Sequence, residues 1–384
     1  MPKQPTNKLK IGFVLDDSLD SADGVQQYVL TLSMWLARQG HDIHYLVGET
    51  SRTDIPQLYS LSRNMKVKFN GNRMSMPLPA SRRALKELLT REQFDVLHVQ
   101  MPYSPFLAGR IIKAAPAATA VVGTFHVAPH SSMVYWANKA LRIMTLRSLK
   151  RFDAVMAVSS VAQDFARETF HLESDIVPNT VDLTPFAAAQ PLPQYKDSKN
   201  VVFLGRLVDR KGCGHLLKAV LYVQQHKLVG NPYKVIICGR GPLEDDLKAF
   251  VRKHQLGNIV EFVGFVSEDD KPAYMASADV AVFPSTGGES FGIVLVESMA
   301  AARGVTLAGN NPGYATVMAP FAETLIEPAD TENLGRTLAD MLANDALRKK
   351  LQVAQHQDVQ QYDAPAVGAR VVEQYERALH KRSR

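Results

Sequence analysis

Short apolar segments alternate with amphipathic helical patterns along this chain, and the alternation runs through twice. Brief apolar runs bounded by turn residues are typical of buried strands, and apolar residues three or four positions apart predict helices. Strands and helices that alternate in this way form a parallel sheet with helices on both faces. The sequence therefore predicts an α/β chain with two doubly wound, Rossmann-like parallel sheets facing a cleft.

The predicted elements lie on either side of Thr184–Lys199, a segment without periodicity that is typical of a linker. The predicted strands are Lys10–Leu15, His41–Val47, Asp95–Val99, Ala118–Thr124 and Asp153–Val158 before it, and Val201–Leu204, Lys234–Cys238, Ile259–Val263, Asp279–Phe283 and Gly304–Ala308 after it. The predicted helices are Val25–Leu36, Ser81–Thr90, Ser104–Ala114, Ser131–Lys150, Val161–Phe170, Gly214–Gln225, Leu243–His254, Asp269–Ala276 and Ile293–Ala302. The tail from Thr331 to Leu379 is expected to be helical in at least two pieces, with a break near Tyr362–Pro365.

Composition narrows the class of protein and its partners. The net charge of +6 favours nucleic acid, an anionic membrane surface or anionic small molecules. Because the basic residues are scattered and no nucleic-acid-binding motif occurs, nucleic acid is not an expected partner. Cys213 and Cys238 are the only cysteines, which argues against a disulfide framework or a zinc site. Since neither a signal-like segment nor a run of about 18 apolar residues is found, we expect a cytoplasmic protein.

The stretch Gly287–Glu297 carries two carboxylates eight positions apart, Glu289 and Glu297. A predicted strand precedes it and a predicted helix follows, so Glu289 should lie in the loop at the carboxyl end of a strand. The first N–H groups of that helix, at Phe291–Ile293, attract an anion. A carboxylate beside them is useful only if it faces an uncharged part of the same ligand. This arrangement favours a sugar diphosphate, with Glu289 on the sugar hydroxyls and Glu297 within reach of a ribose.

Two cations follow the first predicted strand of the second half, Arg206 and Lys211, five positions apart. An arginine and a lysine at a strand's carboxyl end can bind one diphosphate together. Two solvated surface cations are the alternative, which the position at the strand end disfavours. Gly239–Pro242 follows the next strand and is interpreted as a helix-entry turn, because a lone GxG is weak evidence for a phosphate loop.

His126 and His130 are the candidate histidines for the other half of a site. His126 ends a predicted parallel strand, where side chains usually face the ligand. It could bond a sugar hydroxyl or relay a proton, or it could be a packed core histidine. His98, inside a strand, is assigned to packing, and the role of His130 stays open. Because no D-x-D triplet occurs, the cations and helix amides are expected to neutralise a leaving diphosphate without a divalent metal or other cofactor.

Two predicted helices combine basic and apolar residues. One opens with Arg82 and Arg83, and the other spans Met133–Phe152 and includes Trp136. A basic amphipathic helix that bears tryptophan can lie on an anionic membrane. An ordinary surface helix packed on its own domain shows the same pattern, so a membrane-binding helix and a surface helix both remain possible interpretations.

These residues, in this order, resemble the retaining glycosyltransferases of family four, which have the GT-B fold. The resemblance covers nearly the whole chain, and its most specific part is the E-x7-E pattern from Glu289 to Glu297. Further matches are Gly205-Arg206 with Lys211-Gly212, the loop Asp23–Gln26 and the turn Val177–Asp182. Within the family, GGESFGIVLVE, TFH and Gln361-Tyr362-Asp363 are similar to phosphatidylinositol mannosyltransferases.

The resemblance implies a role for each matching position. Arg206 and Lys211 would hold the donor diphosphate, and His126 would contact the donor sugar near the reacting carbon. The other implied donor contacts are Gly24 at the diphosphate, Glu289, Phe291, Gly292, Ile293 and Val294 at the sugar and phosphate, Glu297 at the ribose, and Val266 and Lys271 at the base. The implied domains are residues 1–183 on the acceptor side, a linker at 184–199 and a donor domain at 200–361, with residues 362–384 crossing back.

The chain departs from the family pattern in several places. Asp23-Gly24 replaces two glycines, Thr180 replaces a glycine, and Arg303 stands where a small residue is usual. Near Ser131 it lacks the lysine with which the phosphoinositide enzymes bind the acceptor phosphate. The candidate acceptor-side residues are Asp20, Arg82, Arg83 and His130.

The resemblance implies a retaining hexosyltransferase that moves mannose or glucose from GDP-mannose or UDP-glucose. The acceptor would be a lipid or a lipid-linked glycan, reached from the cytoplasm at the inner face of the cell membrane. A soluble sugar or small metabolite as acceptor is one alternative. A GT-B protein that binds a nucleotide sugar without turnover is the other.

Overall fold

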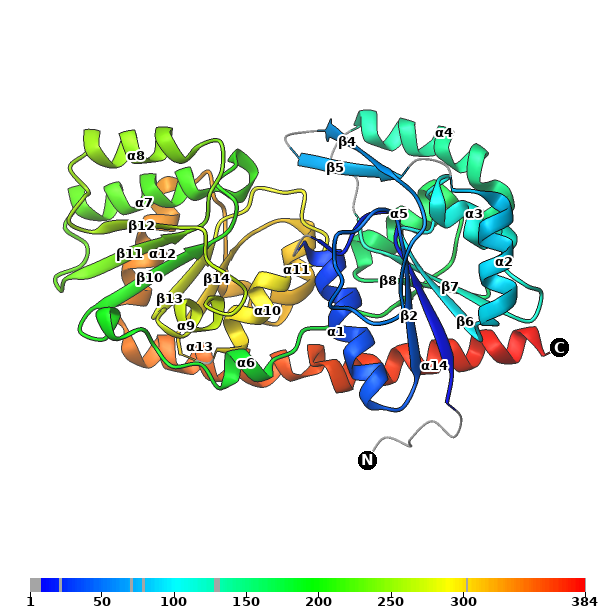
Figure 1. Cartoon of the computed structure of the whole chain (residues 1–384). Helices are drawn as coiled ribbons and strands as arrows, with labels where there is room; N and C mark the ends of the chain where they lie inside the picture. The colour runs from blue at the N-terminus through cyan, green and yellow to red at the C-terminus, as the bar shows by residue number, and fades with distance from the viewer. Residues whose placement is uncertain are drawn as a thin grey trace. The chain divides into compact units, whose positions relative to one another are not determined.

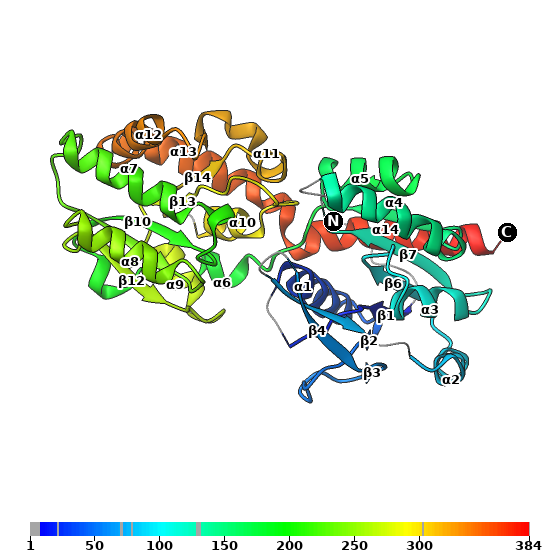
Figure 2. The same ribbon diagram turned by 90° about the horizontal axis from the view of Figure 1, so that it is seen from above.

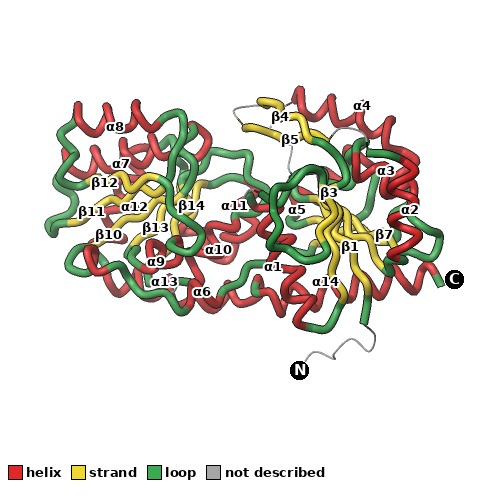
Figure 3. Tube along the Cα trace, viewed as in Figure 1, coloured by secondary structure: helices red, strands yellow, loops and turns green. Residues whose placement is uncertain are grey.

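The computed structural model describes residues 8–20, 23–69, 72–77, 80–127, 132–301 and 303–383. The chain forms two compact units, the first made of Met1–Thr180 with Ala364–Arg384 and the second of Val181–Asp363. In each unit a sheet lies between helices (Figure 3). The two doubly wound parallel sheets predicted from the alternation of strands and helices are thereby confirmed.

The first unit is built on a seven-stranded parallel sheet with the order β3-β2-β1-β6-β7-β8-β9. Its strands are β1 (Lys10–Val14), β2 (Asp42–Val47), β3 (Leu58–Ser60), β6 (Val96–Gln100), β7 (Ala120–Phe125), β8 (Ala154–Ala157) and β9 (Asp175–Ile176). Its helices are α1 (Gly24–Arg38), α2 (Arg82–Glu92), α3 (Leu107–Ala114), α4 (Ser132–Leu149), α5 (Ser160–Phe170) and α14 (Ala364–Arg382). Because β1 lies between β2 and β6, the loops that follow β1 and β6 meet at the carboxyl edge of the sheet, where ligands of such folds bind. Asp16, after β1, accepts hydrogen bonds there from the Ser104 hydroxyl and, at 2.6 Å, from Ala108 N.

The last helix, α14, packs beside α1 and along β7 (Figure 1). Val371 and Tyr375 of α14 share one apolar core with Phe13 of β1. A Cβ at Gly368 would lie 2.3 Å from the Trp35 ring, so the glycine permits this close approach of α14 to α1. Elsewhere in the same unit, α4 and α5 lie side by side (Figure 2).

Several short elements of the first unit were not predicted from the sequence. An antiparallel hairpin of β4 (Asn64–Phe69) and β5 (Asn72–Pro77) forms a sheet of its own. Strands β3 and β9 have three and two residues. β3 and β9 are too short to show a period, so only their neighbours in the folded sheet define them. The six-residue strands of the hairpin lack the continuous apolar runs from which the buried strands were predicted.

The second unit is built on a six-stranded parallel sheet with the order β12-β11-β10-β13-β14-β15. Its strands are β10 (Lys199–Leu204), β11 (Tyr233–Cys238), β12 (Val260–Gly264), β13 (Val280–Phe283), β14 (Val305–Gly309) and β15 (Leu325–Ile326). Its longer helices are α7 (Cys213–Gln225), α8 (Glu244–Lys253), α9 (Lys271–Ala276), α10 (Ile293–Ala300), α11 (Pro312–Met318), α12 (Thr331–Ala343) and α13 (Asp345–Asp358). Short turns of helix are α6 (Thr184–Ala187), η1 (Pro193–Tyr195), η2 (Asp209–Lys211), η3 (Ala319–Thr324) and η4 (Val359–Tyr362). The predicted break in the helical tail is the step from η4 to α14.

The segment Thr184–Lys199, expected to be a linker, is instead part of the second unit. It contains α6 and η1, and it runs into β10 at Lys199. The side chains of Phe186 and Tyr195 are buried, and the Tyr195 hydroxyl donates to Glu261 Oε1 at 2.9 Å. Buried aromatic side chains and polar contacts therefore pack a segment whose proline and alanine content is typical of a linker.

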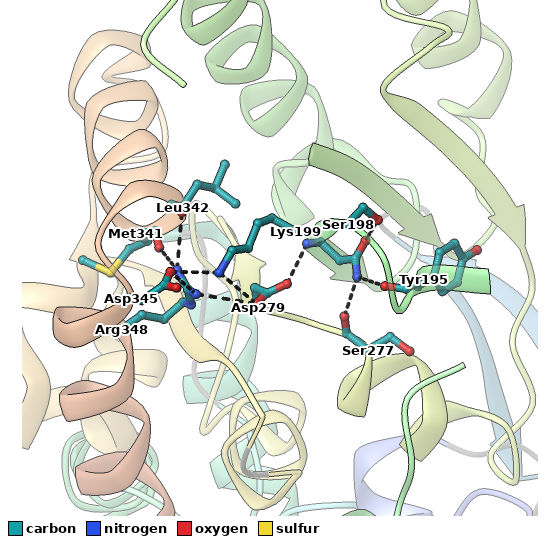
Figure 4. A network of polar contacts seen from close by, with 10 residues as sticks. Tyr195, Ser198, Lys199, Ser277, Asp279, Met341, Leu342, Asp345 and Arg348 are labelled. Carbon is teal, nitrogen blue, oxygen red and sulfur yellow. Dashed lines mark hydrogen bonds and ion pairs between the residues drawn. The ribbon is translucent and has the colours of Figure 1, made fainter. Parts of the chain in front are cut away.

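A polar network joins the amino ends of β10 and β13 to α12 and α13 (Figure 4). Arg348, whose side chain is 9% exposed, lies 2.6 Å from Asp345 Oδ1 and donates to the Met341 carbonyl oxygen at 2.5 Å. Asp279 accepts from Asn200 N at 2.9 Å and lies 3.6 Å from Arg348 Nη2. Because the network occupies the edge opposite the carboxyl ends of the strands, we assign it to stability.

Candidate functional site

At the carboxyl edge of the second sheet, the loops approach one another closely at glycine residues. Gly212 has φ +75°, and a Cβ there would lie 1.8 Å from the carbonyl oxygen of Pro284. Gly239 has φ +146°, and a Cβ there would lie 1.9 Å from the carbonyl oxygen of Gly205. Only glycine permits these approaches. The loops after β10, β11 and β13 are thereby held against one another at the edge where the sequence predicts diphosphate binding.

Glu289 lies in the loop between β13 and α10, and three donors surround one of its oxygens. Oε1 is 2.7 Å from Arg210 Nη1, 2.8 Å from Lys211 Nζ and 3.0 Å from Ser285 Oγ. The Glu289 side chain is only 12% exposed. Burial alone would raise its pKa, but the charges of Lys211 and Arg210 outweigh burial, so the pKa is lowered. Glu289 is therefore an ionised carboxylate at neutral pH.

Arg210 is a site residue that was not predicted from the sequence. The turn η2 directs its guanidinium onto Glu289. Its carbonyl oxygen also accepts from Ser285 Oγ and Thr286 N, both at 2.9 Å. Its place beside Lys211 in the sequence was the one available signal. Arg206 lies on the same loop directly after Gly205, with its side chain exposed.

The helix α10 begins at Ile293, and Gly292 precedes it with φ +108°. The first amide groups of a helix have no partner within it, so those of Ile293 and Val294 point out of the amino end of α10. Phe291 is buried and stacks edge-to-face on Tyr362 at 5.4 Å between ring centroids. Phe291 therefore anchors the loop, while the amides of α10 remain at its surface.

Glu297, about one turn into α10, forms a buried ion pair with Lys271. Its Oε1 lies 2.6 Å from Lys271 Nζ, and the two side chains are 6% and 7% exposed. Burial raises the pKa of Glu297, and the Lys271 ammonium counteracts this in part. The same ammonium lies 2.6 Å from Glu268 Oε2. Val266 precedes this group in the loop between β12 and α9 and is half-buried.

In the first unit, His126 follows β7 directly and is 5% exposed. Its Nε2 lies 2.5 Å from Gln100 Oε1, and its ring meets that of Tyr28 edge-on at 4.8 Å. Burial lowers the pKa of His126 to about 3, against a smaller opposite effect of Asn179. The imidazole is therefore neutral at physiological pH, which favours hydrogen bonding over proton relay.

His98 has the packing role expected from its place inside a strand. Its Nδ1 bonds the Tyr375 hydroxyl at 2.8 Å, and its Nε2 bonds Thr124 Oγ1 at 2.7 Å. Both ring nitrogens are thus used within the core, and the bond to Tyr375 ties α14 to the sheet.

The remaining first-unit candidates lie in separate places. Gly24 is the exposed first residue of α1. Asp20 accepts from Thr50 Oγ1 at 2.6 Å and from Ser51 N at 3.1 Å, so its carboxylate fastens the loop after β1 to the loop after β2. Arg82 and Arg83 are exposed at the start of α2, where Arg83 pairs with Glu87 at 2.8 Å. His130 lies outside the described residues.

One departure from the family pattern does not involve the site. Arg303 lies in the turn before β14, at the amino edge of the second sheet, and its Nη2 donates to Gln190 Oε1 at 3.0 Å. A Cβ at the next residue, Gly304, would lie 2.4 Å from the carbonyl oxygens of Ala278 and Asp279. The glycine is therefore needed for packing, and the cation at Arg303 is remote from Glu289.

The described residues show neither a metal-binding cluster nor a membrane-spanning helix. Within the described ranges, no group of three or more His, Cys, Asp and Glu side chains could hold a metal ion. Within the same ranges, no helix has the length and apolar character needed to cross a bilayer.

Comparisons with known proteins agree on one family. Residues 22–185 match the model described as Glycosyltransferase Family 4, and residues 187–357 match Glycosyl transferases group 1. The phosphatidyl-myo-inositol mannosyltransferase of Mycolicibacterium smegmatis is 32% identical over 376 residues, which cover 96% of this chain and 94% of the relative.

Solved structures extend the similarity to the fold. A glycosyltransferase from Rickettsia africae has a TM-score of 0.74 at 16% identity and covers 96% of this chain and 99% of its own. The Anabaena protein Alr3699/HepE, solved in complex with UDP, has a TM-score of 0.67 at 15% identity, covering 95% of this chain and 99% of its own.

Proposed function

The chain belongs to glycosyltransferase family four, and on that premise we propose that it moves mannose from GDP-mannose to a lipid acceptor at a membrane surface, with retention of configuration. The observation that carries the proposal is Glu289, an ionised and nearly buried carboxylate bound by Lys211 and Arg210. Such a carboxylate accepts hydrogen bonds from sugar hydroxyls, and the neighbouring cations bind phosphate oxygens. The mannosyl group and the lipid acceptor are supported by similarity to the phosphatidyl-myo-inositol mannosyltransferase of Mycolicibacterium smegmatis.

The cations of the second unit suit a reaction that builds up negative charge on a leaving group. When the bond between the anomeric carbon and the diphosphate breaks, the diphosphate oxygen keeps the electron pair. Arg206, Arg210 and Lys211 all belong to the loop after β10 and supply positive charge to that oxygen. The acceptor oxygen bonds the same face of the anomeric carbon, and its proton passes to the leaving diphosphate. His126, whose pKa is lowered to about 3, stays neutral throughout and serves as a hydrogen-bonding group.

A second carboxylate beside the expected base position favours guanine. Glu268 lies 2.6 Å from Lys271 Nζ, and its side chain is 52% exposed. An ionised carboxylate only accepts hydrogen bonds. Guanine offers it two adjacent donors, N1–H and the 2-amino group, whereas uracil offers one N–H between two carbonyl oxygens. We therefore favour GDP-mannose over UDP-glucose as the donor.

The donor base is tested by thermal shift, because a ligand that binds only the folded protein raises its Tm. GDP-mannose should raise the Tm more than UDP-glucose at the same concentration. The Glu268→Gln variant should lose most of the preference. A larger shift with UDP-glucose would overturn the assignment of guanine.

An amphipathic surface of α4 supports a lipid acceptor. Ile143 and Met144 are 70% and 67% exposed, and Leu146 is 38% exposed. Arg147 and Lys150 are exposed next to them. Apolar side chains enter the acyl region of a membrane while cations bind anionic headgroups. This surface therefore suits an anionic bilayer.

Cosedimentation with vesicles tests the membrane part. The protein should bind vesicles that contain phosphatidylglycerol and bind phosphatidylcholine vesicles much less. The double variant Ile143→Ser/Met144→Ser should lose binding, while the control Val353→Ser, which changes a 39% exposed residue of α13, should keep it. Absence of binding to anionic vesicles at low salt would instead favour a soluble acceptor.

Glu289→Gln tests the transfer itself. The amide keeps the size of the side chain but cannot balance Lys211 and Arg210, so turnover should fall by about 100-fold or more. The matched control is Glu332→Gln, which removes an exposed carboxylate of α12 and should leave turnover unchanged. Radiolabelled GDP-mannose is incubated with and without lipid acceptors, and transfer and hydrolysis are measured separately. Near-normal transfer by Glu289→Gln would refute the proposal, as would donor binding without any turnover by the wild type.

A further inference from the structure

A buried glutamine, Gln100, holds the imidazole of His126. Gln100 is the last residue of β6 and is 1% exposed. In the parallel pairing of β6 with β7, Gln100 lies opposite Thr124, two positions before His126. The two side chains meet at 2.5 Å between Oε1 and Nε2.

Gln100 does not have the properties of a residue kept for stability. Its other polar atom, Nε2, is buried and has no hydrogen-bond partner among the described residues. A buried polar atom left without a partner destabilises the folded state, because it loses its hydrogen bonds to water and gains none in return. An apolar residue of the same size would avoid this cost. The glutamine is therefore better explained by its bond to His126 than by the packing of the core.

The bond to Gln100 determines where the imidazole carries its proton. A carboxamide oxygen only accepts hydrogen bonds, so His126 Nε2 must be the donor. Asn179 is the other carboxamide with a hydrogen-bonding interaction with this ring. Since burial keeps the ring neutral, Nδ1 of the tautomer protonated at Nε2 has a lone pair and can only accept. The edge-on ring of Tyr28, 4.8 Å away, limits rotation of the imidazole.

We propose that Gln100 is a positioning residue that fixes His126 in the neutral tautomer protonated at Nε2, so that Nδ1 accepts a hydrogen bond from a hydroxyl of the donor sugar. This inference rests on the proposed transferase function. An imidazolium at the same place would reverse the hydrogen bond and would put a positive charge beside an anomeric carbon that itself becomes positive. Gln100 supplies an acceptor without a negative charge, and so it orients the ring without promoting its protonation.

Gln100→Glu is the informative variant, because it exchanges the neutral acceptor for a charged one in the same place. An ionised carboxylate beside Nε2 favours the imidazolium and raises the pKa of His126. The kcat of this variant should therefore fall about 10-fold for each pH unit below the raised pKa and recover above it. The wild type should show no such limb, because its His126 stays neutral.

Gln100→Leu separates positioning from folding. Without the acceptor the tautomer is no longer fixed, so kcat should fall about 10-fold or more at every pH, while the KM for the donor changes little. The Tm should stay close to that of the wild type, because the unpartnered amide is removed together with the bond. A large loss of Tm with kcat preserved in the folded fraction would overturn the proposal in favour of a packing role.

The tautomer is also observed directly, without substrate and without any variant. In protein with ¹⁵N-labelled histidine side chains, His126 should give the nitrogen shifts of a neutral ring protonated at Nε2, unchanged from about pH 5 to about pH 8. His98, bonded at both nitrogens to Thr124 and Tyr375, is the internal reference. A ring protonated at Nδ1 would overturn the inference even if transfer activity is found. The expected tautomer in a protein without transfer activity would instead count against the proposed function.

Discussion

Replacing Lys271 with methionine should leave a carboxylate buried and unpaired in the second unit. The Lys271 and Glu297 side chains are 7% and 6% exposed and meet at 2.6 Å. Methionine keeps most of the length of the lysine side chain and removes only the charge. Breaking a buried pair by removing one partner costs about 3–5 kcal/mol, because the remaining charge is not compensated. We expect Lys271→Met to lose free energy of unfolding of this order near neutral pH.

The loss of free energy of unfolding should depend on pH, and the direction of this dependence follows from the pKa of Glu297. Burial raises the pKa of Glu297, and without the ammonium the folded-state pKa rises further. Above the unfolded-state pKa of about 4.3, the folded state then keeps a proton that the unfolded state has released. The free energy of unfolding of Lys271→Met therefore falls as the pH rises, by about 1.4 kcal/mol per pH unit until the folded-state pKa is passed. The deficit should be small near pH 4 and largest near neutral pH.

Urea unfolding followed by circular dichroism at several pH values measures this deficit. The double variant Lys271→Met/Glu297→Leu should recover most of the stability, because no charge is left buried. Wild-type stability of Lys271→Met at neutral pH would refute the reasoning. So would a deficit of the same size at acidic and neutral pH, because it would show that lost packing dominates over the unpaired charge.

Three further predictions concern the carboxyl edge of the second sheet. Gly212→Ala should lower the free energy of unfolding by about 2 kcal/mol or more, since the added Cβ would lie 1.8 Å from the Pro284 carbonyl oxygen; an unchanged urea midpoint would contradict this. Arg210→Met should lower kcat/KM for the donor about 10-fold, with Arg210→Lys retaining part of the activity; steady-state kinetics equal to wild type would show that the 2.7 Å contact with Glu289 is not used. Phe265→Trp places an indole at a 74% exposed position directly before Val266, and its fluorescence should change when GDP is added; no change while calorimetry still detects binding would contradict the placement of the base.

The charged residues that follow core strands could be located from the sequence. Lys211, Glu289 and Glu297 each follow a buried strand of the second sheet, directly or within the next helix. Such strands are continuous apolar runs, which show in the sequence pattern, and parallel pairing brings their carboxyl ends to one edge. The pairing of Lys211 with Glu289 at 2.8 Å follows from this geometry. Sheet order and alternation therefore suffice to gather charges that are far apart in the sequence.

The features that the sequence did not predict are the directions of side chains in local turns. Arg206 and Arg210 belong to the same loop, yet it is the Arg210 guanidinium that the turn η2 brings to Glu289. The direction of a side chain in such a turn depends on individual backbone angles, for which a pattern of residue types carries no information. The segment Thr184–Lys199 shows the same limit, because the burial of Phe186 depends on a surface formed by α9 and α10.

The role of Gln100 can be inferred only from the register between neighbouring strands. A glutamine at a strand end has no charge to attract notice, and no periodicity distinguishes it from a core residue. Its role can be inferred once the pairing of β6 with β7 is known, because this pairing places Gln100 opposite Thr124. Side chains two positions apart on one strand share a face, so His126 lies diagonally across from Gln100 and within its reach. Neutral partners of site residues are therefore best sought by pairing the polar residues at adjacent strand ends after the strand order is fixed.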